Sequence, residues 1–92
     1  MLHSALPMDR ICAVLGATRA EIKSEKRNNW KARRRWVIAY ALHHRKNMTT
    51  VQIARLLDLD HSSVCNALAK APKLVESEPE FANILDAIEA VL

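Results

Sequence analysis

Glycine is almost absent from this 92-residue sequence, and proline and aromatic residues are scarce. Gly16 is the only glycine, there are three prolines, and aromatic residues make up 4% of the chain. Tight turns use glycine, and strands favour aromatic and β-branched residues, so little in this composition supports a β-sheet. Alanine, leucine and charged residues, which favour helix, dominate instead. The sequence therefore predicts an all-α protein.

Long apolar runs and paired cysteines are missing as well. No stretch approaches the roughly 20 apolar residues that span a bilayer, and the N-terminus lacks a secretion signal, so no membrane contact is expected. Cys12 and Cys65 lie far apart and form no C-x-x-C pair. This pattern favours a reducing cytoplasm, with both cysteines acting as small apolar side chains. The length predicts one domain over residues 1–92.

Charge is distributed unevenly along the chain. Residues 19–46 hold ten Lys or Arg and two Glu, a balance of +8, and Arg33, Arg34 and Arg35 are consecutive. Residues 74–92 carry five acidic side chains and no basic one, a balance of −5. A basic half is typical of polyanion binding, and an acidic end suits solvent or a protein partner. An ordinary solvated surface is the alternative, which the arginine run disfavours.

Apolar spacing predicts a compact bundle of about six helices. Gly16 should end the first helix, Thr18 and Glu21 form a capping box before the second, and Thr49 or Thr50 should cap the fourth. Residues 28 and 29 are interpreted as a turn, and residues 71–80 as a loosened connection. The helices are expected at about 7–15, 19–26, 32–45, 51–57, 60–70 and from 79 onward.

The fourth and fifth predicted helices are separated by only three residues, "DLD" at 58–60. A helix of about eight residues, a tight turn and a helix of about ten are typical of a helix-turn-helix, here over about residues 49–70. Any antiparallel helix pair gives a similar pattern, so this signal alone is of medium strength.

Four consecutive polar residues, Asp60 to Ser63, open the fifth helix, and neither catalysis nor metal binding explains them well. Neighbours on a helix point about 100° apart, whereas a catalytic triad converges. The chain also lacks a nucleophile elbow, a glycine-rich phosphate loop and paired carboxylates. We therefore expect no enzyme activity, no cofactor and no small-molecule substrate.

Metal binding is the second alternative for this cluster. His61 and Cys65 have the i, i+4 spacing of two ligands, but a structural zinc site needs four. His43 and His44 are adjacent and are expected to point to different sides of their helix. No metal site is predicted.

Helix capping and base reading together account for the cluster. Asp60 can cap the helix, because its carboxylate accepts from exposed N–H groups. In a helix-turn-helix the same positions enter the major groove. There Asp60 can accept from cytosine, His61 can donate to guanine, Ser62 can bond a base or phosphate, and Asn66 can pair with adenine.

At these residues the chain resembles domain IV of DnaA, the bacterial replication initiator. "DHSSV" at 60–64 resembles the D-H-T-T-V signature of that family. The likeness extends to "ARRR" at 32–35, "IAYAL" at 38–42, "TTVQIARLL" at 49–57, "FANILDAI" at 81–88 and the opening "MDRICAVLGATRAEIKSEKR". It covers nearly the whole chain and implies a Trp-repressor-like helix-turn-helix fold.

The resemblance implies a role for each matching residue. Asp60, His61 and Ser62 would contact bases, and an arginine of "ARRR", with Arg33 preferred over Arg34, would enter the adjacent minor groove. The remaining expected contacts are with phosphates, from Ser63, Thr49, Thr50, Val51, Arg35, Lys26 and Lys70. The family usually has G-G-R before D-H, whereas this chain has Asp58 and Leu59, and serine replaces threonine twice. Recognition of the initiator's own site is therefore not expected.

No ATPase domain is contained in these 92 residues, so melting of an origin is not predicted. We expect a stand-alone, sequence-specific double-stranded DNA-binding protein that regulates transcription in the cytoplasm, associated with the nucleoid. Small activators of phage-like gene clusters, including gene transfer agents, use similar domains. The acidic C-terminal face would contact RNA polymerase or another regulator. The alternatives are a phage or plasmid replication accessory factor that binds DnaA-box-like sites, and a helical module that binds only proteins.

Overall fold

The computed structural model describes residues 7–24 and 29–92 and places six helices in them. This part of the chain contains no strand, so the expected all-α architecture is confirmed. None of its helices is both long enough and apolar enough to cross a membrane. The helices are α1 (Pro7–Leu15), α2 (Arg19–Ser24), α3 (Asn29–Lys46), α4 (Thr50–Leu57), α5 (His61–Ser77) and α6 (Pro79–Ala90).

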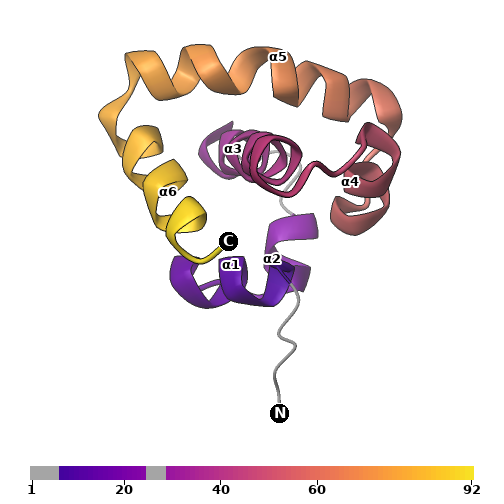
Figure 1. Cartoon of the computed structure of the whole chain (residues 1–92), viewed down its shortest axis with the longest axis horizontal. Coiled ribbons are helices and arrows are strands. Elements are labelled where there is room, and N and C mark those ends of the chain that lie inside the picture. Colours follow the sequence, from indigo (N-terminus) through magenta and orange to yellow (C-terminus); the bar gives the residue numbers. More distant parts are fainter. Residues whose placement is uncertain (1–6, 25–28) are drawn as a thin grey trace.

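Helix α3 lies at the centre of the molecule (Figure 1). Helix α5 crosses over it, α4 and α6 flank it on two sides, and α1 and α2 cover the side opposite α5. The Cα radius of gyration is 12.2 Å, close to the roughly 12 Å typical of a compact chain of this length. The helices therefore share one core around α3.

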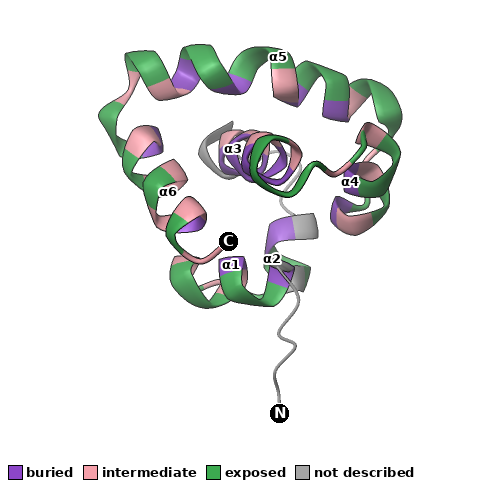
Figure 2. Ribbon diagram, in the orientation of Figure 1, coloured by how far each residue is buried: buried purple, intermediate pink, exposed green. Residues whose placement is uncertain are grey.

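Every helix around α3 contributes buried residues (Figure 2). Met8 and Ile11 of α1 and Phe81 and Ile88 of α6 are fully buried, as the spacing of their helices predicts. Helix α3 is the most buried because it has neighbours on several sides. Its fully buried residues are Val37, Ile38, Ala39, Ala41 and Leu42, and α4 and α5 add Ile53, Leu57, Val64 and Ala67.

Local signals at the first two helices are confirmed. Gly16 has a φ of +66° at the end of α1, a left-handed conformation that glycine adopts without strain. The hydroxyl of Thr18 accepts from the N–H of Glu21 at 3.1 Å, and the Glu21 carboxylate accepts from the N–H of Thr18 at 2.9 Å. This is the predicted capping box.

Helix α5 is longer than predicted. It continues to Ser77, and Pro72 lies inside it, although residues 71–80 were expected to loosen. Ala71 and Leu74 are buried against the core, whereas Pro72 is exposed. Tertiary packing therefore holds the helix together across the proline. The predicted end near residue 70 is wrong.

Two expectations for α3 are also wrong. The helix begins at Asn29, so this residue does not belong to a turn, and Asn28 lies outside the described residues. The rings of His43 and His44 do not point apart. Their centroids are 5.2 Å from each other in an edge-on arrangement, and Nδ1 of His43 is 2.9 Å from the Met48 carbonyl oxygen.

Candidate nucleic-acid interface

The connection between α4 and α5 depends on a left-handed residue that is not glycine. Asp58 has a φ of 57°, and the N–H of Leu59 donates to the Ala54 carbonyl at 2.9 Å. Aspartate tolerates this conformation better than most residues. Asp58 therefore closes α4 within three residues in a chain that has no glycine here.

Thr49, and not Thr50, caps α4. The Thr49 hydroxyl accepts from the N–H of Gln52 at 3.1 Å, and the Gln52 side chain accepts from the N–H of Thr49 at 2.9 Å. Thr50 is consequently the first helical residue, and its hydroxyl lies 2.9 Å from Nε2 of His61. One hydrogen bond thus joins the first residues of α4 and α5.

Asp60 caps α5, as predicted. Its Oδ1 accepts from the N–H of Ser63 at 2.9 Å, and the helix begins at His61. The hydrogen bonds from Ser63 hold the pKa of the Asp60 carboxyl below its ordinary value. The carboxylate is therefore negatively charged at neutral pH, at the positive end of the helix dipole.

The tip of α5, residues 60–63 with Asn66, projects into solvent. Asp60, His61, Ser62 and Asn66 are exposed and Ser63 is half-buried. Val51, beside them at the start of α4, is 51% exposed, which is unusual for a large apolar side chain. The structure therefore places the predicted base contacts and the predicted α4 contacts at the same end of the molecule.

Cys65 is the exposed neighbour of His61. Its Sγ lies 3.8 Å from Nδ1 and 3.9 Å from Nε2 of that imidazole. Within the described part of the chain, no group of three or more His, Cys, Asp or Glu residues could hold a metal ion.

Arg33 and Arg35 lie on the side of α3 that meets α5. Arg35 is only 6% exposed and lines a narrow hollow of about 110 Å³ with Trp36, Leu59, Ser63 and Asn66. Arg33 is 41% exposed, and its Nη1 is 3.3 Å from Oε2 of Glu78. Arg35 is therefore close to the tip of α5, and Arg33 lies farther along the same side of α3.

A pocket that the sequence did not predict lies between α3 and the second half of α5. We call it the basic pocket; it has a volume of about 320 Å³ and is lined by Arg33, Trp36, Lys70, Lys73, Leu74, Ser77 and Glu78. The Lys70 ammonium lies 5.4 Å from the centre of the Trp36 ring, a cation–π distance. Lys73 was overlooked because α5 was predicted to end near residue 70. The i, i+3 spacing of Lys73 from Lys70 was the sequence signal that could have placed both lysines on one face of α5.

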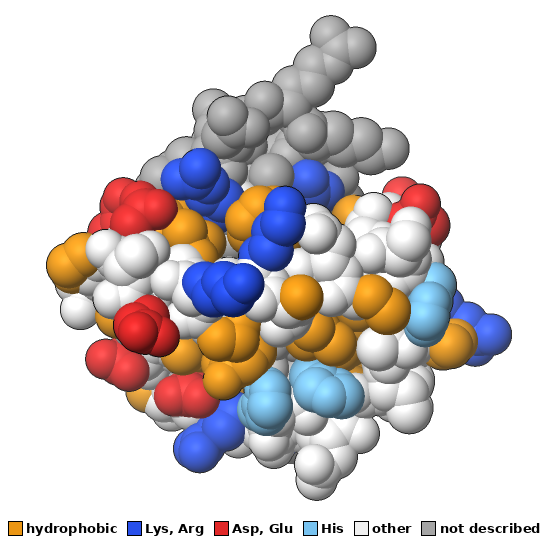
Figure 3. Space-filling model, turned by 90° about the horizontal axis from the view of Figure 1, so that it is seen from above, with side chains coloured by type: hydrophobic (Ala, Val, Ile, Leu, Met, Phe, Trp, Pro, Cys, Tyr) orange, Lys and Arg blue, Asp and Glu red, His pale blue; other side chains and the backbone are white. Residues whose placement is uncertain are grey.

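Charged side chains are unevenly spread over the face of the molecule that carries α5 (Figure 3). Acidic side chains gather at the left, over the end of α5 and the start of α6, and several basic side chains lie nearer the middle. Glu76, Glu80 and Asp86 of this acidic end are exposed. Negative charge is therefore concentrated at the C-terminal end of α5 and on α6.

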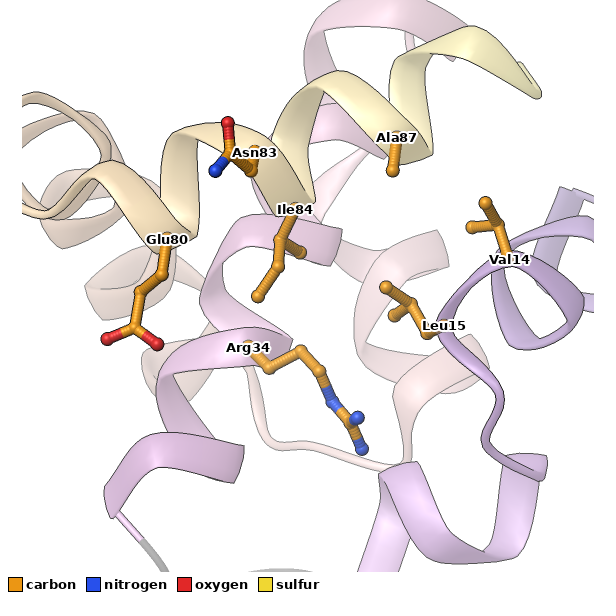
Figure 4. Close-up of a pocket in the computed structure, with 7 residues that line it drawn as sticks. All are labelled: Val14, Leu15, Arg34, Glu80, Asn83, Ile84 and Ala87. Atoms are coloured by element: carbon orange, nitrogen blue, oxygen red, sulfur yellow. The ribbon is translucent and has the colours of Figure 1, made fainter.

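Arg34 lies in a different place from Arg33. It is 7% exposed and lines a cavity of about 440 Å³ between α1 and α6 (Figure 4). One residue of helix turns a side chain by about 100°, which carries Arg34 to the side of α3 away from the tip of α5. Arg33 is therefore the more accessible of the two arginines. Lys26, a predicted phosphate contact, lies outside the described residues.

The chain matches no protein-family model, no curated protein and no solved structure.

Proposed function

We propose that α4 and α5 form a helix-turn-helix, and that the protein binds double-stranded DNA sequence-specifically through the tip of α5. The observation that carries this proposal is the row of polar residues at the start of α5, four in succession and all at least partly exposed. Capping the helix needs only Asp60. Ser62 and Asn66 stand one turn apart on the exposed face, where the second helix of a helix-turn-helix meets base edges.

Each exposed residue of the tip has a chemistry suited to a base edge. Asp60 carries a carboxylate that accepts from cytosine N4, and His61 can donate to guanine. The Asn66 amide matches adenine N6 and N7 in a bidentate pair. Ser62 adds a hydroxyl that bonds either a base or a phosphate. These four residues are the proposed base contacts.

Phosphates would be held from the start of α4. The first N–H groups of a helix have no partner within it and carry a partial positive charge, so a phosphate suits this position. Thr49, Thr50 and Val51 stand there, and Ser63, on the first turn of α5, is a further proposed phosphate contact. Such contacts fix the register of the protein on the duplex without reading its sequence.

Arg33 would enter the adjacent minor groove, as the resemblance to DnaA domain IV implies. Its partial exposure and its position on the α5 side of α3 support it over the buried Arg34. We infer the Trp-repressor-like version of the fold from the same resemblance.

Transcription regulation is the proposed biological role. The acidic end of α5 and α6 faces away from the tip, so DNA binding would leave it open to RNA polymerase or another regulator. The D-H-S-S-V signature favours a second candidate, a replication accessory factor that binds DnaA-box-like sites. Genome-wide occupancy separates them, because a regulator would occupy promoters and an accessory factor would occupy origins.

The central test is site selection from random duplexes, followed by binding assays on the selected site and its single-base variants. We expect Asn66→Ala and His61→Ala to lose about 1–3 kcal/mol of discrimination, each at one base position. Asn83→Ala is the matched control, because Asn83 is an exposed asparagine on α6. It should leave affinity and preference unchanged.

Two outcomes would contradict the proposal. If Asn66→Ala and His61→Ala weakened binding to every duplex equally, the tip of α5 would not be the base-reading element. If no duplex bound in a salt-dependent manner, the protein-binding module would be the better interpretation.

A further inference from the structure

The lining of the basic pocket carries more cations than carboxylates. Arg33, Lys70 and Lys73 line it, and Glu78 is the only carboxylate that lines it. Trp36 forms an apolar wall, and its ring lies under the Lys70 ammonium. A hollow of about 320 Å³ with three cations and one flat apolar wall suits an anion such as a phosphate group.

The pocket lies between two elements of the proposed interface. Lys73 follows Asn66 by two helical turns, which is roughly 10 Å along α5. Arg33 stands on the opposite wall, on α3. With the tip of α5 in a major groove and Arg33 in the adjacent minor groove, the sugar-phosphate strand that separates the two grooves must pass over this pocket.

We propose that the basic pocket is a phosphate-binding site in which Lys70 and Lys73 hold this strand, and that Glu78 competes with the DNA for Arg33. The inference rests on the proposed DNA-binding function and adds Lys73 and Glu78 to the interface. A free phosphorylated small molecule would share the same chemistry, so the test has to distinguish the two sources.

Glu78 is well placed to act as the competitor. Its Oε2 lies 3.3 Å from Nη1 of Arg33, and both side chains are about 40% exposed. Ion pairs as exposed as this one are weak, because water and salt screen them. DNA that binds Lys70 and Lys73 therefore draws Arg33 away from the Glu78 carboxylate at little cost.

The first experiment measures the salt dependence of duplex binding for Lys73→Gln. Each phosphate contact contributes about 0.9 to the slope of log affinity against log salt concentration. We expect the slope to fall by about that amount, with a several-fold loss of affinity at low salt that is equal for all sequences. Arg10→Gln, which removes the same charge from α1 on the far side of the molecule, should have little effect.

The second experiment removes the competitor. Glu78→Gln should raise affinity about two- to fivefold at low salt, and a background of Arg33→Gln should abolish the gain, because the two residues would act as a coupled pair. Circular dichroism and thermal unfolding establish that each variant keeps its helices. An unchanged affinity in Glu78→Gln would overturn the competitor role.

Duplex length and a free anion distinguish the sources of the phosphate. Shortening the duplex at the end that reaches the basic pocket should remove the effect of Lys73→Gln while His61→Ala still relaxes base preference. The proposal fails if Lys73→Gln binds long duplexes like Arg10→Gln while His61→Ala keeps its effect, and the DNA-binding function then stands.

Inorganic pyrophosphate is the probe that tests whether the basic pocket binds a free phosphorylated molecule. In a Trp30→Phe background, Trp36 is the only tryptophan and reports on the pocket. If pyrophosphate changed its fluorescence while Lys73→Gln left duplex binding intact, the pocket would serve a free phosphorylated molecule and the proposal would be wrong. Absence of duplex binding by the unmodified protein would instead remove the proposed function, and this inference with it.

Discussion

Asp60 combines two roles, since the carboxylate that caps α5 is also a proposed base contact. The Ser63 hydrogen bonds lower its pKa below the ordinary value of 3.8. A carboxyl whose pKa is lower in the folded state adds stability that is fully present above 3.8 and is lost as the pH falls through the folded-state value. We expect the unmodified protein to unfold at a higher temperature than Asp60→Asn at pH 7. This difference in unfolding temperature should shrink as the pH falls below 3.8.

Thermal unfolding followed by circular dichroism from pH 7 to pH 2 checks this expectation. Asparagine keeps an acceptor for the N–H of Ser63 but has no charge, so it isolates the ionisation. A gap that stayed constant with pH would show that the carboxylate charge does not stabilise α5.

Residue roles that depend on local spacing could be predicted from the sequence, and roles that depend on packing could not. Asp60 caps α5 and Thr18 pairs with Glu21 because each bond spans three residues of chain. Arg33 and Arg34 look equivalent in sequence. Only the positions of α1 and α6 reveal that Arg34 is buried, since those helices form the walls of its cavity.

Helix α5 carries an internal proline whose cost should be measurable. Pro72 has no N–H to donate to the carbonyl four residues before it, and its ring disturbs the preceding turn. Because Pro72 is exposed, replacing it with alanine removes this cost without disturbing the core. We expect Pro72→Ala to raise the free energy of unfolding by about 1–3 kcal/mol, measured by urea denaturation.

Pro79→Ala is the matched control for this change. Pro79 occupies the first turn of α6, where a missing N–H costs nothing. Replacing Pro79 with alanine should leave the free energy of unfolding unchanged or lower it slightly. Equal gains from both variants would mean that Pro72 does not strain α5.

The length of α5 shows why element boundaries were harder to predict than element types. Proline and the polar run that follows it are local signals for a helix end, and they predicted a break near residue 70. Burial of Ala71 and Leu74 against the core outweighs these signals. Lys73 was lost from the predicted interface for the same reason, since its place on α5 depends on the helix continuing.

At the scale of the whole molecule, stability depends on a small core. A chain of this length has a free energy of unfolding of roughly 5–14 kcal/mol. Phe81 is fully buried, so Phe81→Ala should cost about 3–5 kcal/mol, a large share of the total. Denaturation by urea measures the loss. Ile84→Ala, at a half-buried position of the same helix, should cost less, and equal losses would contradict the central place given to Phe81.

The composition and the apolar spacing predicted six helices, but not their arrangement around α3. That arrangement depends on contacts between residues far apart in the sequence, which periodicity cannot report. It separates the acidic end of α5 and α6 from the tip of α5, and it creates the basic pocket between α3 and α5.

The hydrogen bond between Thr50 and His61 couples two tasks that the proposed interface would otherwise perform independently. Thr50 stands where α4 would grip the backbone, and His61 stands where α5 would meet a base. A hydroxyl can donate to a phosphate while its oxygen accepts from an N–H of the imidazole, so Thr50 could contact the backbone and hold the His61 ring at the same time. The orientation of the ring that meets a base would then depend on the residue that grips the backbone.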